Sequence, residues 1–304
     1  MITRYEHGGV KWVDIENPTI DEVVSISNEF DLGEILIDEL VTPTAKPRLD
    51  VFPGFVYAVL HFPALRYTHG LEANHEIDIV FGKDFIITTH YATASATFDL
   101  AKALEAASLR KNQDTATPTG LIFLELTQRL YQAADHELDA LEDTIETIEE
   151  NIFSGKERKM VTALSFASRE LLMHKRLLGT HHEILEAFEK AVATLFGNEM
   201  SRYVRAANTL HYRVHNRALI MNDIVTELRD TNMALLFTRQ NEITKNLTIV
   251  AFLTFPLSVI AAVFGMNTAY TPVVNDPNGF WIIVGGMVVL TLLFFTYFKL
   301  KKWF

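Results

Sequence analysis

The sequence contains no cysteine, which excludes disulfide bonds, thiolate metal sites and cysteine nucleophiles. It also lacks the excess of lysine and arginine that phosphate binding requires, because 27 basic residues are outnumbered by 38 acidic ones and the net charge is −11. Neither a phosphate-binding glycine loop, nor an HExxH motif, nor a nucleophile elbow occurs. We therefore expect a protein that is not an enzyme, holds no resident cofactor and binds no nucleic acid.

Charged residues are absent from two long stretches near the C-terminus. None occurs between Lys245 and Asp276, and none between Asp276 and Lys299. These stretches contain the apolar runs Leu247–Phe264 and Phe280–Phe298, and a helix needs roughly 20 mostly apolar residues to cross a bilayer. Two buried helices of a soluble core are the alternative, but soluble helices normally keep a polar face. We therefore predict two membrane spans, with the lipid bilayer as a partner.

The basic residues near these spans predict the orientation of the chain in the membrane. Lys299, Lys301 and Lys302 follow the second span, whereas the loop 265–279 contains no Lys or Arg. Lys and Arg concentrate in cytoplasmic segments, so we expect both termini in the cytoplasm and an integral protein of the cell membrane. The N-terminal segment has no apolar stretch, so we expect no signal peptide.

Patterns in the first hundred residues predict a mixed α/β domain at 1–93. Short segments rich in Val, Ile, Phe and Tyr are separated by Pro, Gly and Asn, which is typical of strands. The predicted strands are Val10–Ile15, Arg48–Phe52, Phe55–Phe62, Glu76–Phe81 and Phe85–His90. Short helices are predicted at Thr19–Phe30, with Thr19 or Asp21 as N-cap, and at Gly33–Leu40.

Helical patterns dominate the rest of the chain. Thr119–Asn151 and Lys156–Phe196 contain few helix breakers, Gly197–Asn198 ends a helix, and Ser201 is a candidate cap for the next one. No Gly occurs between Ser201 and Phe264, which predicts one helix of about 60 residues that is roughly 90–100 Å long. Neighbouring helices or subunits must cover a helix of this length. The predicted organisation after the α/β domain is a cytoplasmic helical region at 94–199, a stalk helix at 200–246, a first span at 247–266, an outer loop at 267–279, a second span at 280–298 and a basic tail at 299–304.

Two groups of polar residues in the helices allow more than one interpretation. Eight carboxylates lie within Asp135–Glu150, either as a solvated helix face or as an electrostatic lure for cations. Two histidines are four residues apart and share a helix face, and three others are similarly placed; such a spacing can bind Zn²⁺. These histidines are His211 and His215, and His174, His181 and His182. Structural or solvated roles are the alternative, because the sequence fixes no third ligand nearby.

The end of the first apolar run carries a distinctive motif. Gly265–Met266–Asn267 follows the run directly, at the outer end of the first of two C-terminal spans. Asn241–Lys245 precedes that span, Pro256 lies in its middle, and the chain ends in a lysine-rich tail. Trp12–Thr19, which reads WVDIENPT, is a further match near the N-terminus. Together these features resemble the CorA family of divalent-cation channels over nearly the whole length.

The resemblance implies a funnel-shaped homopentamer with a central pore. Gly265, Met266 and Asn267 would form the ion-selectivity filter, and Asn267 would hold the metal ion through its hydration waters. The residues that the family pattern places along the pore are Asn241, Thr244, Leu247, Ala251, Phe255, Ser258 and Ala262. The residues that would form a basic collar at the cytoplasmic mouth are Lys299, Lys301 and Lys302.

The implied function is Mg²⁺ influx driven by the membrane potential, with Co²⁺ or Ni²⁺ also permeating. Ala269 and Val273 stand where the family has loop glutamates, so a zinc transporter, with or without proton coupling, is an alternative. Ala206 stands at the family's regulatory aspartate, so closure by intracellular Mg²⁺ is expected to be weaker or to use other carboxylates. The other carboxylates considered are Asp50, Asp78 and Asp84. A non-conducting, membrane-anchored scaffold or sensor is the third interpretation.

Overall fold

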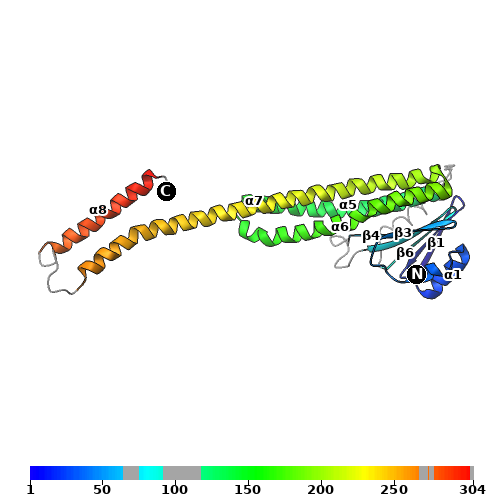
Figure 1. The fold of residues 1–304 in the computed structure, drawn as a ribbon, viewed down its shortest axis with the longest axis horizontal. Helices are drawn as coiled ribbons and strands as arrows, with labels where there is room; N and C mark the ends of the chain where they lie inside the picture. The colour runs from blue at the N-terminus through cyan, green and yellow to red at the C-terminus, as the bar shows by residue number, and fades with distance from the viewer. Residues whose placement is uncertain (64–74, 92–117, 267–272, 274–276, 302–304) are drawn as a thin grey trace. The chain divides into compact units, whose positions relative to one another are not determined.

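The computed structural model describes residues 1–63, 75–91, 118–266, 273 and 277–301 (Figure 1). The chain divides into two compact units, Met1–Arg229 and Asp230–Phe304. Within these described ranges, the first unit contains a β-sheet, two short helices and three long helical segments, and the second contains two apolar helical segments. The longest helix, α7 (Asn198–Phe264), contributes to both units.

A six-stranded mixed sheet forms the centre of the first unit. Its strands are β1 (Ile2–His7), β2 (Val10–Glu16), β3 (Arg48–Phe52), β4 (Phe55–Phe62), β5 (His75–Gly82) and β6 (Phe85–His90). Their order across the sheet is β1-β2-β6-β5-β4-β3. The pair β2–β6 is parallel, and the other neighbouring pairs are antiparallel.

Five strands confirm the sequence prediction, and one was missed. β3, β4 and β6 have the predicted bounds, and β2 and β5 are only slightly longer than predicted. The missed strand, β1, reads ITRYEH and carries no clear alternation of apolar and polar residues. It is an edge strand that pairs with β2 alone, from Ile2 opposite Ile15 to His7 opposite Val10. Only this pairing makes it a strand, so its own sequence gave little signal.

The helices α1 (Ile20–Phe30) and α2 (Ile35–Val41) pack against one face of the sheet. Of the two caps considered for α1, Thr19 is the N-cap and Asp21 lies in the first turn. The Thr19 side chain accepts from the Glu22 amide, and the Glu22 carboxylate accepts from the Thr19 amide. The core between these helices and the sheet is apolar. Its buried members include Val13, Ile15, Val23, Ile26, Leu36, Leu40, Val59, Val80 and Ile87.

The helices α5 (Pro118–Phe153) and α6 (Glu157–Phe196) cover the opposite face (Figure 1). Three phenylalanines join them to the sheet: Phe81 of β5 lies 5.5 Å from both Phe123 of α5 and Phe188 of α6, measured between ring centres. Phe123 and Phe188 are 5.1 Å apart, and all three rings meet edge to face. The two helices therefore share one aromatic core with the sheet.

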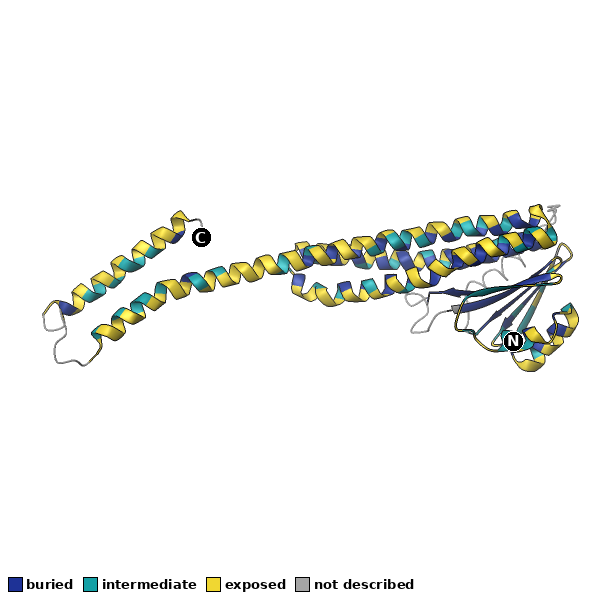
Figure 2. Ribbon diagram, in the orientation of Figure 1, coloured by how far each residue is buried: buried dark blue, intermediate teal, exposed yellow. Residues whose placement is uncertain are grey.

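Within the first unit, α5, α6 and α7 run side by side as a three-helix bundle (Figures 1 and 2). Buried residues recur along each helix at alternating steps of three and four, which is the heptad spacing of coiled coils. Along α6 they are Leu164, Ala167, Leu171, His174, Leu178, His181, Leu185, Phe188 and Val192. Along α7 they are Met200, Val204, Ala207, His211, Val214, Ala218, Met221, Val225 and Leu228. Gly120 of α5 sits so close to Tyr203 that an added Cβ would lie 2.3 Å from its ring.

The long helix confirms the prediction of a single uninterrupted element, with one correction. α7 begins at Asn198, so Ser201 lies inside the first turn and is not the N-cap. Its hydroxyl donates to the Asn198 carbonyl at 3.0 Å, as hydroxyls inside helices commonly do.

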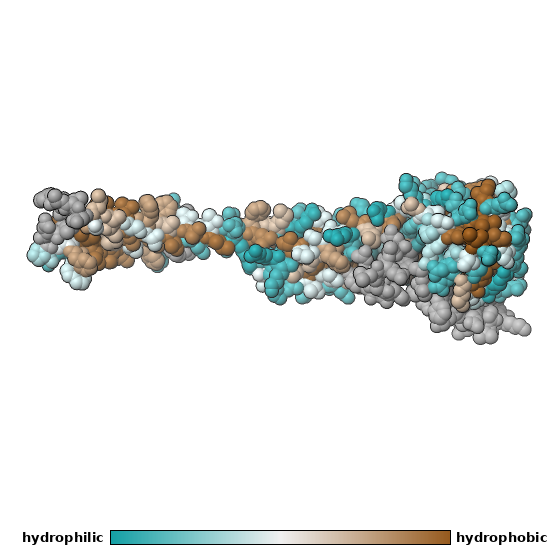
Figure 3. All heavy atoms as spheres, turned by 90° about the horizontal axis from the view of Figure 1, so that it is seen from below, coloured by the Kyte–Doolittle hydropathy of each residue, from teal (hydrophilic) through white to brown (hydrophobic). Residues whose placement is uncertain are grey.

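The helices of the second unit are the C-terminal part of α7 and the whole of α8 (Gly279–Leu300). Both helices are long and apolar enough to cross a membrane, and only 6% of each apolar window is buried within the chain. Figure 3 shows the apolar side chains gathered on the surface of this segment. Ile249 of α7 and Phe298 of α8 are the buried exceptions, at 2% and 5% exposure. Apolar side chains thus cover the surface of this unit. Such a surface is favourable in contact with lipid and unfavourable in contact with water.

Candidate ion pathway and the polar clusters of the first unit

The residues expected along the pore lie in one continuous stretch of α7. All seven, from Asn241 to Ala262, are exposed in the single chain. Leu247 and Phe255 are the most exposed of the apolar ones, at 70% and 72%. Because Val250 and Val259 on other faces are also exposed, exposure alone does not distinguish a pore face from a lipid face.

The two hydroxyl groups of this stripe have a fixed orientation. Thr244 donates to the Gln240 carbonyl at 2.9 Å, and Ser258 donates to the Thr254 carbonyl at 3.0 Å. Each hydroxyl proton is therefore used inside the helix, and only the oxygen lone pairs are directed outward. Such groups accept hydrogen bonds from water but do not donate them, which suits the hydration shell of a cation.

The helix ends at the start of the expected filter. The Gly265 amide donates to the Ala261 carbonyl at 2.9 Å, and the Met266 amide reaches the Val263 carbonyl at 3.4 Å. A Cβ at Gly265 would lie 2.9 Å from the Ala261 oxygen, so a side chain there would displace this helix end. Asn267 lies outside the described residues, as do Ala269 and Lys302. Of the expected basic collar, Lys299 and Lys301 are exposed at the end of α8.

The structure does not support the metal sites that the sequence suggested for the first unit. Among the described residues, no group of three or more His, Asp or Glu side chains is placed to hold a metal ion. Ala206 lies on α7 as a half-buried residue without ligand atoms in its side chain. Asp78 is fully buried and already hydrogen-bonded, so it is not suited to exchange Mg²⁺ with solvent, whereas Asp84 is exposed.

Three of the histidines, His174, His181 and His211, lie in the interior of the three-helix bundle, whereas His215 is half-buried and His182 is exposed. His181 Nε2 donates to the His61 carbonyl at 3.0 Å, and His211 Nε2 donates to the Leu178 carbonyl at 2.7 Å. Burial lowers the pKa of His181 to about 3 and the pKa of His211 to about 4. His174 is also buried, and burial lowers its pKa too. These contacts favour the structural interpretation over metal binding for the three buried histidines.

The acidic run is only partly a solvated helix face. Arg217 of α7 reaches three of its carboxylates: Asp135 at 2.8 Å, Asp139 at 2.6 Å, and Glu142. Glu137 is buried, at 1% exposure. The carboxylates that remain exposed beyond these contacts are Asp143, Glu146, Glu149 and Glu150. Arg217 thus ties the middle of α5 to α7, and Arg213 of α7 adds a longer contact to Asp135 at 4.0 Å.

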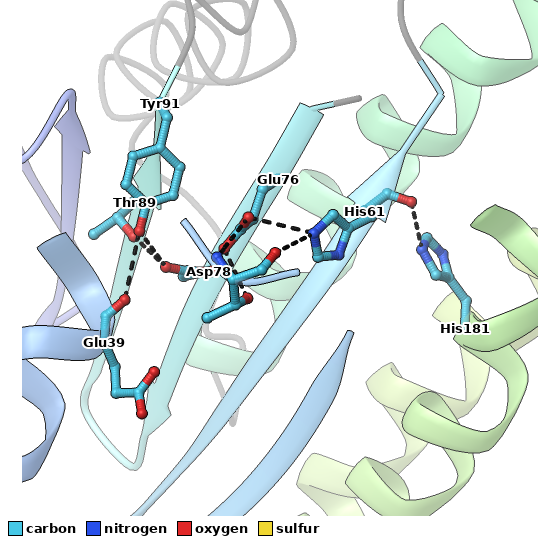
Figure 4. Close-up of polar contacts among 8 residues, drawn as sticks. Glu39, His61, Glu76, Asp78, Thr89, Tyr91 and His181 are labelled. Carbon is cyan, nitrogen blue, oxygen red and sulfur yellow. Dashed lines mark hydrogen bonds and ion pairs between the residues drawn. The ribbon is translucent and has the colours of Figure 1, made fainter. Parts of the chain in front are cut away.

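A buried polar cluster on β4 and β5 was not predicted from the sequence (Figure 4). The Glu76 carboxylate accepts from the Thr44 amide at 2.7 Å, from the Thr44 hydroxyl at 2.9 Å, and from His61 Nε2 at 3.3 Å. Burial alone would raise the pKa of Glu76, but the hydrogen bonds from His61 and Thr44 outweigh it and lower that pKa. The polar residues of HEIDI, alternating with isoleucines inside an otherwise apolar strand, were the available signal.

Comparison with known proteins agrees with this architecture. The chain matches the family model described as CorA-like Mg²⁺ transporter protein over residues 7–301. It is 23% identical over 296 residues to the cobalt/magnesium transport protein CorA of Thermotoga maritima, covering 96% of this chain and 83% of that protein. It is 20% identical to the protein of the same name from Methanocaldococcus jannaschii, covering 96% and 90%.

Solved structures share the fold. The complete structure of the CorA magnesium transporter from Methanocaldococcus jannaschii superposes with a TM-score of 0.83 at 19% identity, covering 99% of this chain and 93% of that one. The cytoplasmic domain of ZntB from Vibrio parahaemolyticus superposes with a TM-score of 0.55 at 14% identity, covering 76% and 90%. The lower score accompanies a chain that lacks the membrane part.

The fold therefore defines a class: an integral membrane protein with an α/β domain, a long helical stalk and two C-terminal spans. Because the family model spans nearly the whole chain, the protein belongs to the CorA family. It is a divalent-cation transporter of that family, and its relatives are transporters rather than enzymes.

Proposed function

We propose that the protein is a homopentameric channel that conducts Mg²⁺ into the cell, with both termini in the cytoplasm. The observation that carries this proposal is the course of α7, which continues without a break from the first unit through the apolar stretch and ends at Phe264, directly before Gly265. Five such helices around an axis would bring five copies of Asn267 together directly beyond their ends. Co²⁺ and Ni²⁺ would pass by the same route.

The side chains of the stripe support passage of a hydrated ion. Mg²⁺ loses its waters reluctantly, so a pore for it works best by binding those waters. Thr244 and Ser258 present only acceptor lone pairs, and the amide oxygen of Asn267 would offer the same chemistry at the outer mouth. Leu247 and Phe255 would form apolar constrictions that gate the pore by dewetting. No resident cofactor is needed.

The membrane potential supplies the driving force. A divalent ion that moves inward gains about 4.6 kcal/mol per 100 mV, twice the value for a single charge. Lys299, Lys301 and Lys302 would surround the cytoplasmic mouth and anchor the chain in the positive-inside orientation.

Ion flux into proteoliposomes tests the proposal. Vesicles with an inside-negative potential should take up Mg²⁺, reported by a trapped Mg²⁺-sensitive dye, while a Zn²⁺-sensitive dye is read in parallel. Asn267→Ala should abolish selective Mg²⁺ uptake, whereas Asn216→Ala, at an exposed position of α7 in the first unit, should leave it unchanged. Native mass measurement of the same protein should give five chains per particle.

The other outcomes separate the alternatives. Uptake of Zn²⁺ alone, especially with a pH dependence, would indicate a zinc transporter. The fold that the chain shares with the ZntB domain is the reason to test this second function. A pentamer without uptake of either ion would indicate a membrane-anchored scaffold or sensor. Equal Mg²⁺ uptake by the wild type and Asn267→Ala would show that the filter lies elsewhere.

A further inference from the structure

A fully buried carboxylate lies in the middle of the sheet, far along the chain from the expected pore. Asp78 of β5 pairs with Val59 of β4 and Thr89 of β6 and has 0% exposure. Its Oδ2 accepts from the Thr89 hydroxyl at 2.9 Å and from the Tyr91 hydroxyl at 3.2 Å (Figure 4). Its Oδ1 has no hydrogen-bond partner in the part of the chain that the structure describes. An ionised carboxylate with one unsolvated oxygen is costly to bury.

The neighbours of Asp78 place a second carboxylate, already ionised, beside it. Glu76 lies two residues earlier on the same face of β5 and accepts hydrogen bonds from Thr44 and His61, which hold it in the charged form. The titratable and charged groups around Asp78 are Glu39 of α2, Arg48 of β3, Tyr57 and His61 of β4, Glu76 of β5, and Tyr91 after β6. Arg48 is engaged by the Glu39 carboxylate, so it does not neutralise Asp78 directly.

Burial, and then the charge of Glu76, raise the pKa of Asp78 to about 7. The hydrogen bonds from Thr89 and Tyr91, and then the charge of His61, oppose this shift in the pKa of Asp78 without cancelling it. Asp78 is consequently a group whose charge changes near neutral pH, unlike an aspartate free in water.

One residue connects this cluster to the helical bundle. The His61 ring donates from Nε2 to Thr44 and Glu76 on one side of β4. The His61 carbonyl accepts from His181 Nε2 of α6, at 3.0 Å, on the other side (Figure 4). A change in charge that disturbs Glu76 therefore acts on the same residue that joins β4 to α6.

We propose that Asp78 is a proton-binding site whose ionisation loosens the contact between β4 and α6. In the protonated form, Asp78 is neutral and tolerates the charge of Glu76. When the O–H bond breaks and the proton passes to water, two like charges face each other in a buried site, and Oδ1 needs solvent. The cluster then opens enough to admit water, which weakens the hydrogen bonds of Glu76 to Thr44 and His61. This site adds a response to pH that the proposed transport function does not require.

Infrared difference spectroscopy on the full-length protein in lipid bilayers, without an ion gradient, tests the proton site directly. The carbonyl band of a protonated carboxylic acid should disappear as the pH rises from about 5.5, where ordinary carboxylates are already ionised, to about 8.5. Asp78→Asn should lack that band. Asp84→Asn, at an exposed position in the turn before β6, should keep it. A band that survives in Asp78→Asn, or its absence from the wild type, would overturn the assignment.

Hydrogen exchange of backbone amides tests the consequence. In the wild type, amides of β4 and of α6 near His181 should lose protection between those pH values, after correction for the intrinsic pH dependence of exchange. Asp78→Asn should keep the low-pH protection throughout, and Asp84→Asn should behave as the wild type. The same loss of protection in Asp78→Asn would contradict the proposal.

Glu76→Gln gives a second test that does not need Asp78 to be replaced. Removing the neighbouring charge should move the midpoint of the Asp78 titration to lower pH, and an unchanged midpoint would count against the arrangement. Neither spectroscopy nor exchange requires ion flux, so a failed transport assay is distinguishable from a failure of this proposal.

Discussion

The hydroxyl of Tyr131 on α5 donates a hydrogen bond to Nδ1 of His181 on α6, across 2.9 Å. The direction follows from the other side of the ring, because Nε2 of His181 carries the proton that it donates to the His61 carbonyl. Both side chains are buried, at 1% and 0% exposure. One neutral histidine thus joins β4, α5 and α6, and its tautomer is fixed by its two partners.

Tyr131→Phe should destabilise the protein by about 1–3 kcal/mol, because it leaves His181 Nδ1 buried without a donor. The lost hydroxyl removes little packing, so the cost should come from the hydrogen bond. Thermal unfolding of the purified protein measures it. Tyr212→Phe, at an exposed position of α7, is the matched control and should change the midpoint little. Equal midpoints for Tyr131→Phe and the wild type would mean that the bond contributes no net stability.

Acid should destabilise the bundle through His181. Burial lowers its folded-state pKa to about 3 from an ordinary value of 6.5, so the unfolded chain binds more protons between those values. The stability it contributes is complete above about pH 6.5 and is lost as the pH falls toward 3. His181→Gln, whose amide can still donate to the His61 carbonyl, should flatten the fall of the unfolding midpoint over this range.

Asp78 should change the stability with pH in the direction opposite to His181. Its folded pKa of about 7 lies above the ordinary value of 3.8, so the folded state binds more protons between them, and its stabilising effect is lost as the pH rises toward 7. Each variant must therefore be compared with the wild type at every pH.

The unfolding midpoint plotted against pH decides the role of His181. Parallel curves for His181→Gln and the wild type would rule out the proposed role of the histidine.

Gly265→Ala should reduce ion flux strongly while leaving the assembled protein intact. Its Cβ would lie 2.9 Å from the Ala261 oxygen, so the end of α7 and the residues that follow would move. Gly285→Ala in α8 is the matched control, because among the described residues nothing beyond its own stretch of helix lies within 4 Å of the added Cβ. Proteoliposome uptake after equal reconstitution measures both. Wild-type flux in Gly265→Ala would show that the filter does not depend on the geometry of this helix end.

Arg217→Gln should destabilise the contact between α5 and α7 by about 1–2 kcal/mol, a small value because most of these carboxylates are partly exposed. The variant leaves Asp135, Asp139 and Glu142 without their shared partner. Salt screens both the attraction in the wild type and the repulsion in the variant. The difference in unfolding midpoint should therefore shrink at high ionic strength. Arg205→Gln, which removes a single pair with Glu189, is the control and should show a smaller effect.

Much of the fold follows from local sequence patterns. Pro53–Gly54 separates two runs of strand-forming residues, and β3 and β4 have the predicted bounds on either side of it. Thr19 and Glu22 form the capping box because both are close in sequence. β1 could not be predicted with the same ease, since an edge strand with mixed polarity becomes a strand only by pairing with β2.

The histidines show what local sequence patterns cannot predict. Spacing alone indicated that His211 and His215 share a helix face, and it allowed Zn²⁺ binding. The heptad repeat of buried residues places His174, His181 and His211 inside the bundle. There, backbone carbonyls and Tyr131 satisfy part of their hydrogen-bonding capacity. The ligand atoms of a metal site must converge from several helices, and no spacing along one helix can specify that.

The sequence by itself determined the two spans, the long helix and the family motif, because length, hydropathy and the absence of helix breakers act on neighbouring residues. Only the tertiary structure decided that Thr44 and His61 meet at Glu76, beside Asp78, since they come from the segment after α2 and from two different strands. Strand register placed these residues together, and burial then changed their acid–base behaviour. Charge regulation of this kind depends on solvent exclusion, which is a property of the folded chain.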